Sequence, residues 1–133
     1  MIVVDASVLV VALADDGPDG DQTRTRLRGQ RLFAPEIVDL EVLSALRSLA
    51  RAGSLDARRS RFAVDDLADL PLSRAPHLPL IPRCWELRDN LTAYDGAYVA
   101  LAEMLGAVLL TGDRRLVAAP GLRCAVELLP AAD

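Results

Sequence analysis

Two apolar runs of this sequence each end on an aspartate that a predicted helix follows. Asp5 comes directly after "IVV" at 2–4, and Asp113 follows "VLLTG" at 108–112. Ligands of open parallel sheets bind at the carboxyl ends of the strands, so the two carboxylates share one edge if their strands are neighbours. One such aspartate alone is better explained as a helix N-cap. Two of them, each after an apolar run, favour a common site.

Two further carboxylates lie in predicted helices that are otherwise apolar. Glu41 belongs to the helix predicted over 36–51, and the neighbouring positions on its helical face carry no basic side chain. Asp95 belongs to the helix predicted over 93–105, where the helix dipole also favours an acid in the first turn. A solvent-exposed glutamate and a first-turn aspartate are the simpler alternatives. The small or uncharged neighbours of both residues favour an inward-facing site.

Carboxylates that meet in one place repel one another and raise one another's pKa values. Divalent cations relieve that repulsion, and Mg²⁺ and Mn²⁺ prefer oxygen ligands. A metal held in this way polarises a phosphate and lowers the pKa of a bound water, and two metals about 4 Å apart stabilise both the attacking and the leaving oxygen. This chemistry requires no histidine, cysteine or lysine. The acids that could meet here are Asp5, Glu41, Asp95 and Asp113.

The composition excludes several other kinds of chemistry. All 15 basic residues are arginines, so a P-loop lysine, a Schiff base and a Ser-Lys dyad are ruled out. Cys84 and Cys124 form neither a CxxC pair nor a cluster with zinc-site spacing, and two such lone thiols indicate a reducing compartment. Because the net charge is −4, nucleic acid would have to be bound through local arginines or bound cations.

Helices and strands are expected to alternate along a single domain that covers residues 1–133. This pattern predicts an α/β fold with a mainly parallel sheet. The N-terminal apolar stretch has no positively charged region before it, which argues against a signal peptide. The sequence has no run of about 18 apolar residues that could span a membrane, so we expect a cytoplasmic protein. The expected strands are 2–4, 32–35, 71–76, 107–111 and 124–129. The expected helices are 8–14 capped by Ser7, 22–29, 36–51, 54–70 capped by Ser54, one that begins near Pro82, 93–105 capped by Thr92, and a short one to about 119.

The ordered set of motifs resembles the PIN-domain ribonucleases, and most closely the VapC-type toxins of bacterial toxin–antitoxin pairs. The motifs are "IVVDAS" at the start, Glu41 in an early helix, "AYDGAYVALAE" at 93–103 and "LLTGDRRL" at 109–116. Each motif alone is weakly specific, but the set matches nearly the whole chain in order, length and spacing. The resemblance implies a PIN-like, Rossmann-like three-layer sandwich with a mainly parallel central sheet flanked by helices.

The same resemblance implies a metal-dependent endoribonuclease that hydrolyses RNA phosphodiester bonds with a metal-activated water. The implied cofactor is Mg²⁺ or Mn²⁺, and the implied partners are single-stranded or loop RNA, a cognate antitoxin and a second copy of the chain in a homodimer. Ser7 and Thr111 occupy the hydroxyl positions that accompany the first and last motifs, where they can orient a carboxylate or a water. The acids that match the metal-binding and catalytic residues of the family are Asp5, Glu41, Asp95 and Asp113.

The sequence departs from some relatives directly after its last aspartate. Those relatives carry another acid there, whereas Arg114 and Arg115 follow Asp113, so a fifth ligand from this turn is missing. Two interpretations of the arginines stay open at this point. They contact RNA phosphates, or they are solvent-exposed residues of a first helical turn.

Two other functions compete with the nuclease. A phospho-accepting signalling domain is also α/β with clustered acids and Mg²⁺, but it relies on a lysine, which this chain lacks. A catalytically silent PIN-like module would bind only a protein or RNA, and the presence of all four acids argues against such a loss of activity.

Overall fold

Five parallel strands form one sheet in the order β3-β2-β1-β4-β5 in the computed structural model, which describes residues 1–130. Because β1 lies in the centre and pairs with β4 in parallel, the residues that follow these two strands lie at the same edge of the sheet. The confirmed α/β fold therefore brings Asp5 and Asp113 to one edge. The strands are β1 (Ile2–Val4), β2 (Leu32–Pro35), β3 (Leu72–Ala75), β4 (Val108–Thr111) and β5 (Val126–Leu128).

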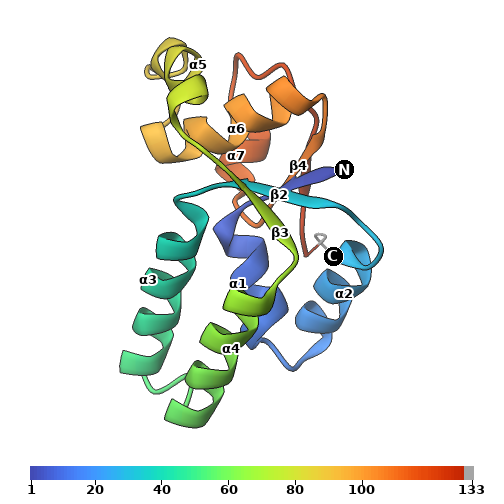
Figure 1. Cartoon of the computed structure of the whole chain (residues 1–133), viewed down its shortest axis with the longest axis vertical. Coiled ribbons are helices and arrows are strands. Elements are labelled where there is room, and N and C mark those ends of the chain that lie inside the picture. Colours follow the sequence, from blue (N-terminus) through green and yellow to red (C-terminus); the bar gives the residue numbers. More distant parts are fainter. Residues whose placement is uncertain (131–133) are drawn as a thin grey trace.

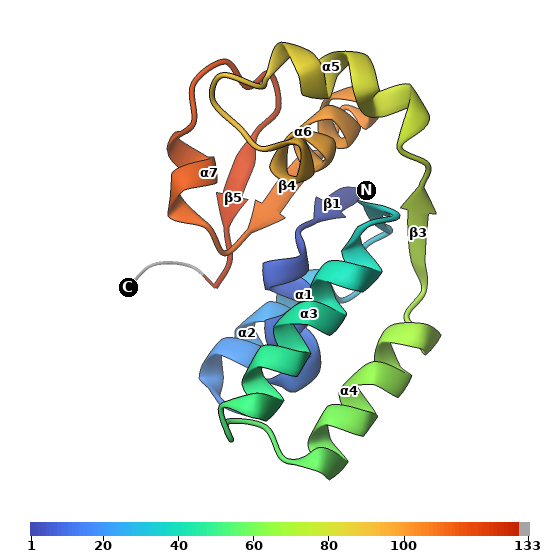
Figure 2. The same ribbon diagram turned by 90° about the vertical axis from the view of Figure 1, so that its left-hand side faces the viewer.

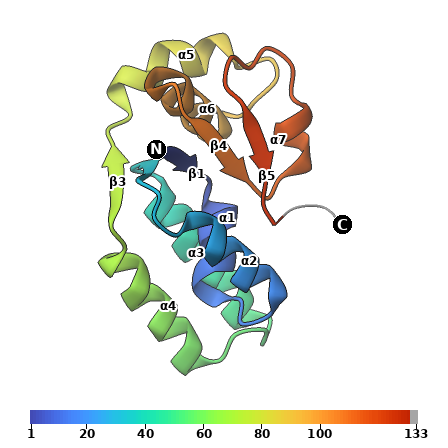
Figure 3. The ribbon, with the colours of Figure 1, turned by 90° about the vertical axis from the view of Figure 1, so that its right-hand side faces the viewer.

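Helices cover both faces of the sheet, as the apolar central strands require. All three residues of β1 are buried, which is typical of parallel strands with helices on both faces. In Figure 1 the first four helices lie below the sheet and the last three above it, and Figure 3 shows α1 and α2 again on the opposite side from α6. The first group is α1 (Ala6–Ala14), α2 (Pro18–Leu27), α3 (Val38–Arg51) and α4 (Ala57–Asp69), and the second is α5 (Ile81–Glu86), α6 (Ala93–Leu105) and α7 (Arg114–Ala118).

Helices α3 and α4 form a hairpin that extends away from the sheet (Figure 2). An apolar stripe on α3, formed by Val38, Val42 and Leu46, is buried in the core. Gly53, whose φ is +78°, follows the end of α3 and allows the chain to turn back toward α4. The first turn of α3 lies near the sheet and carries Glu41, so the hairpin holds this acid beside the edge where β1 ends.

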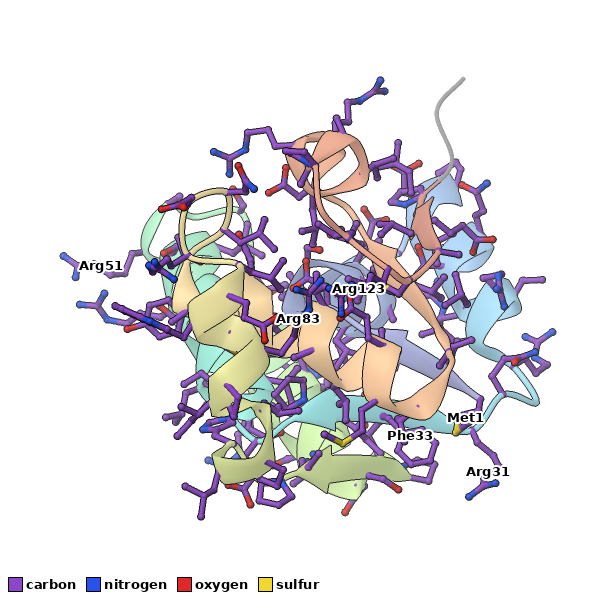
Figure 4. All side chains as sticks on the ribbon, turned by 90° about the horizontal axis from the view of Figure 1, so that it is seen from above. Met1, Arg31, Phe33, Arg51, Arg83 and Arg123 are labelled. Carbon is purple, nitrogen blue, oxygen red and sulfur yellow. The ribbon has the colours of Figure 1, made fainter. Side chains whose placement is uncertain are left out.

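Helix α6 crosses the other face of the sheet and contacts β1, β2 and β4. Its bounds are as predicted, because the Thr92 hydroxyl accepts a hydrogen bond from the Asp95 amide and Gly106 ends the helix in a left-handed conformation. Its outer side is fixed by Glu103, which binds the Arg83 guanidinium of α5 and the backbone amide of Arg123. Figure 4 shows these two arginines side by side over α6. Asp95 therefore projects from a well-anchored helix.

Three helix starts differ from the sequence-based prediction. Helix α1 begins at Ala6, so Ser7 is inside the helix and not its cap. Helix α2 begins at Pro18, a residue suited to a first helical turn, and not at 22. Helix α4 is capped by Asp56, whose carboxylate accepts from the Arg59 amide, and not by Ser54.

A short 3-10 helix, η1 (Leu78–Leu80), precedes α5 and completes the connection from β3 to the second helical layer. Cys84 and Cys124 are both partly buried free thiols. None of the helices in the described part of the chain has the length and the apolar character needed to cross a membrane.

Candidate active site

Asp5 stands at the junction of β1 and α1, where two hydroxyl groups hold its carboxylate. It is the N-cap residue of α1, yet its side chain makes no capping hydrogen bond. Instead its Oδ2 accepts from Thr111 Oγ1 at 2.7 Å and from Ser7 Oγ at 3.1 Å. Both hydroxyls bind the same oxygen, so the side-chain hydrogen bonds found within residues 1–130 leave Oδ1 available to a ligand.

The same two hydroxyls fix the turn between β4 and α7. Thr111 is fully buried, and its Oγ1 also accepts the Asp113 amide at 3.1 Å. Ser7 Oγ accepts the Gly112 amide at 2.9 Å. A side chain at Gly112 would place its Cβ 3.3 Å from Ser7 Oγ, so this position favours glycine. Residues more than a hundred positions apart in the sequence therefore form one rigid corner around Asp5.

Glu41 reaches this corner from α3. Its Oε1 accepts a 2.6 Å hydrogen bond from the phenol of Tyr98, which lies on α6. Burial is the main cause that raises the pKa of Glu41, and the negative charges of Asp5 and Asp95 raise it further, while the Tyr98 hydrogen bond acts in the opposite direction. The fold therefore brings Glu41 near enough to Asp5 and Asp95 for their charges to act on it.

Asp95 lies in the first turn of α6 and interacts with the acids of the opposite elements. Burial raises its pKa, and the charges of Asp5 and Asp113 add to this shift. Arg115 and the Thr92 hydroxyl partly counteract it. The pKa of this acid is thus raised by the same neighbours that would share a metal with it.

Asp113 differs from the other acids because it has a basic partner. The guanidinium of Arg115 donates to both carboxylate oxygens, with Nε 3.3 Å from Oδ1 and Nη2 3.2 Å from Oδ2, and the Arg115 amide donates to Oδ1 at 2.9 Å. These contacts hold the pKa of Asp113 below its usual range. The Arg115 side chain is 91% exposed, so its ion pair with Asp113 is weak and easily exchanged for another partner.

A cavity of about 220 Å³ opens between the start of α6 and α7. Asp95 and Asp113 both line it. Within residues 1–130, no three acidic, histidine or cysteine side chains stand close enough together to form a ready-made metal-binding group. The cavity is lined by Asn90, Leu91, Thr92, Asp95, Asp113, Arg115 and Leu116.

The donor set nevertheless suits a hard cation. Asp5, Glu41 and Asp95 offer carboxylate oxygens, the ligand type that Mg²⁺ and Mn²⁺ prefer. The charge of Asp5 helps to raise the pKa values of Glu41 and Asp95, which indicates an excess of negative charge that the arginine beside Asp113 offsets only at one end. A divalent cation would neutralise this excess.

Comparison with known proteins assigns the family. The sequence profile of the PIN domain matches residues 2–122, and Ribonuclease VapC1 of Mycobacterium tuberculosis is 44% identical over 128 residues that cover 96% of each chain. The chain belongs to the VapC ribonuclease group of the PIN-domain family. Ribonuclease VapC9 of the same organism is 42% identical over 130 residues, which cover 98% of this chain and 99% of that protein.

Solved structures of other proteins share the fold of this chain. PAE2754 from Pyrobaculum aerophilum is 30% identical and superposes with a TM-score of 0.65 over 88% of this chain and 84% of its own. VapC20 from Mycobacterium tuberculosis, described as a sarcin–ricin loop cleaving toxin, superposes with a TM-score of 0.68 over 89% of this chain and 94% of its own. Its sequence is only 14% identical, so this likeness supports the fold alone. The PIN-like three-layer sandwich predicted from the sequence is therefore confirmed.

Several features of this VapC-type site were not identified from the sequence. Tyr98 was not identified, although a buried tyrosine hydroxyl usually requires a partner and this need was the available signal. Arg115 is a 91% exposed residue of the first turn of α7, as one of the two interpretations expected, but its ion pair with Asp113 was not predicted. His77 accepts the Ile37 amide through Nε2 at the start of α3.

Proposed function

We propose that this VapC-type protein is a metal-dependent endoribonuclease and the toxin of a toxin–antitoxin pair. The observation that carries the proposal is the arrangement around Asp5, where Glu41 and Asp95 approach from opposite faces of the sheet and the charge of Asp5 helps to raise the pKa of both. Membership of the VapC ribonuclease group supports the same activity. The catalytic and metal-binding residues that we propose are Asp5, Glu41, Asp95 and Asp113.

Mg²⁺ or Mn²⁺ is the cofactor that these oxygen ligands favour. When bound, such a cation polarises the scissile phosphate and lowers the pKa of an attacking water. Asp5 would hold it through Oδ1, because Thr111 and Ser7 already bind Oδ2. These two hydroxyls keep the carboxylate in one orientation, so they are supporting residues of the site.

The remaining acids differ in what they can do. Glu41 and Asp95 have raised pKa values and are therefore better suited than Asp113, whose pKa is lowered, to accept a proton from the attacking water. Asp113 must exchange its contact with Arg115 for the cation, and the released guanidinium could then donate to an RNA phosphate beside the cavity. The Arg115 guanidinium would then offset part of the repulsion between the RNA phosphates and a protein whose net charge is −4.

We propose single-stranded or loop RNA as the substrate, a cognate antitoxin and a second copy of the chain as protein partners, and the cytoplasm as the compartment. The dimer is supported by an apolar patch on η1 and α5 that consists of Leu78, Ile81 and Trp85, which are 76%, 55% and 67% exposed. Exposed apolar patches mark protein interfaces in soluble proteins. The antitoxin follows from membership of the VapC group.

RNA cleavage with and without Mn²⁺ tests the function. The wild-type protein is expected to cut RNA with Mn²⁺ and to stop when excess chelator is added, and Asp5→Asn is expected to be inactive because it removes a charged ligand. Cleavage that persists undiminished with chelator or in Asp5→Asn contradicts the metal mechanism. Binding of RNA or a protein without cleavage of any RNA would instead favour the silent PIN-like module.

A further inference from the structure

We propose that Tyr98 is a positioning residue of this site, whose phenol group sets the direction of the Glu41 carboxylate toward Asp5 and Asp95. The inference rests on the proposed metal-dependent function. It concerns a residue outside the four acids and the two supporting hydroxyls. Tyr98 acts through Glu41 and touches neither the substrate nor the reacting water.

The hydroxyl of Tyr98 joins two helices that meet at the site from opposite faces of the sheet. Tyr98 lies on α6 one helical turn after Asp95, is fully buried and donates to Glu41 Oε1 on α3 at 2.6 Å. This hydrogen bond therefore links the helix that carries Asp95 to the helix that carries Glu41.

Glu41 needs such a partner because its neighbours repel it. The charges of Asp5 and Asp95 act on Glu41, and no ion pair within residues 1–130 includes it. A glutamate has three side-chain torsions, and ordering them costs conformational entropy. The Tyr98 hydrogen bond occupies Oε1 and so restricts these torsions before a cation arrives. The side-chain hydrogen bonds of residues 1–130 leave Oε2 without a partner, so this oxygen is available to a ligand.

A packing role alone does not account for the hydroxyl. The aromatic ring would fill the same space as phenylalanine, and a buried hydroxyl costs free energy unless it is hydrogen-bonded. The acceptor found for the Tyr98 hydroxyl is Glu41, an acid of the proposed site, and not a backbone carbonyl. Partners that orient a metal ligand in this way commonly change metal affinity or activity about 10- to 100-fold when removed.

The test compares two phenylalanine variants of the full-length, metal-free protein. Tyr98→Phe removes the buried hydroxyl. The control, Tyr94→Phe, removes the other tyrosine hydroxyl of the same helix. The Tyr94 side chain is 60% exposed and makes no side-chain hydrogen bond among the described residues. Mn²⁺ binding is titrated by the electron paramagnetic resonance signal of free Mn²⁺. We expect the Mn²⁺ dissociation constant to rise about 10-fold or more in Tyr98→Phe and to stay unchanged in Tyr94→Phe.

A double-mutant cycle separates positioning from general structural damage. In the Glu41→Gln background, Tyr98→Phe is expected to cause no further loss of Mn²⁺ affinity, because the group that it positions is already neutral. In RNA cleavage, Tyr98→Phe is expected to lower kcat and to raise the Mn²⁺ concentration for half-maximal activity, while KM for RNA stays unchanged. Melting temperatures, measured in parallel, identify any variant that fails to fold.

Two results overturn the inference while leaving the proposed function intact. One is a Tyr98→Phe protein that binds Mn²⁺ as tightly as wild type, and the other is an equal loss of affinity with and without Glu41→Gln. Should Tyr98→Phe not fold, Glu41→Asp provides the same test, since its shorter side chain keeps the charge but cannot reach the phenol. Unchanged Mn²⁺ affinity in Glu41→Asp then contradicts the inference. Wild-type protein that binds no Mn²⁺ refutes the proposed function itself and the inference with it.

Discussion

The two fully buried threonines of the described chain offer a direct test of the corner around Asp5. Thr111 donates its hydroxyl to Asp5 at 2.7 Å and accepts the Asp113 amide, whereas Thr23 has a buried hydroxyl with no hydrogen-bond partner in residues 1–130. Valine has nearly the same shape as threonine but no hydroxyl. Thr111→Val and Thr23→Val therefore make the same chemical change in two opposite settings.

The expected magnitudes follow from these contacts. A hydrogen bond to a charged group contributes about 1.5–3 kcal/mol, and Thr111→Val also leaves the partly buried Asp113 amide without its acceptor. We expect Thr111→Val to lower the free energy of unfolding by about 2–3 kcal/mol, which is a fall in Tm of roughly 10 °C for a domain of this size. Thr23→Val removes an unsatisfied hydroxyl and is expected to leave stability unchanged or to raise it by up to about 1 kcal/mol.

Urea denaturation followed by circular dichroism at pH 7, with chelator present, measures both free energies of unfolding. Equal m-values for the two variants and the wild type would show that the substitutions do not change the surface exposed on unfolding, so the differences in midpoint report differences in stability. The reasoning fails if Thr111→Val is as stable as Thr23→Val, since the buried hydroxyl would then contribute nothing by binding the carboxylate of Asp5.

Three further predictions concern charge, metal and assembly. Burial and neighbouring acids raise the pKa of Asp95 above its usual 3.8, so its ionised form destabilises the metal-free protein at pH 7, and this cost disappears as the pH falls below about 3.8. Asp95→Asn should therefore raise the urea midpoint at pH 7 and leave it unchanged at pH 3.5. A lower midpoint at pH 7 would contradict the assigned cause of the pKa shift. Mg²⁺ at ten times its dissociation constant should add about 1.4 kcal/mol and raise the wild-type Tm by roughly 5 °C, and an equal rise in Asp5→Asn would exclude Asp5 as a ligand. Ile81→Asp should shift the protein from dimer to monomer in sedimentation, because it places a charge in the apolar patch, and an unchanged dimer would place the interface elsewhere.

Local sequence signals were sufficient where one residue determines one feature. The apolar runs before Asp5 and Asp113 predicted β1 and β4, and the alternation of elements predicted that these strands are parallel. Thr92 and Gly106 set the bounds of α6 through a capping hydroxyl and a left-handed conformation. These signals act within a few residues of the chain, so they can be recognised without knowledge of the tertiary structure.

Other features depend on contacts between distant segments. Both Ser54 and Asp56 could have capped α4, and only the folded chain shows that Asp56 binds the Arg59 amide. The acceptor of the Tyr98 hydroxyl lies 57 positions earlier, so no local pattern connects the two residues. Trp85 is 67% exposed, although an apolar side chain of this size is usually buried in a core or an interface, and its place in an interface is therefore a proposal.

Anomalous diffraction from crystals soaked in Mn²⁺ would show whether the acids around Asp5 bind a cation. We expect a manganese peak beside Oδ1 of Asp5 and carboxylate oxygens of Glu41 and Asp95, with Asp113 released from Arg115. We also expect this peak to be lost in Asp5→Asn crystals. A peak elsewhere on the molecule, or none beside Asp5 at saturating Mn²⁺, would contradict the proposed metal site.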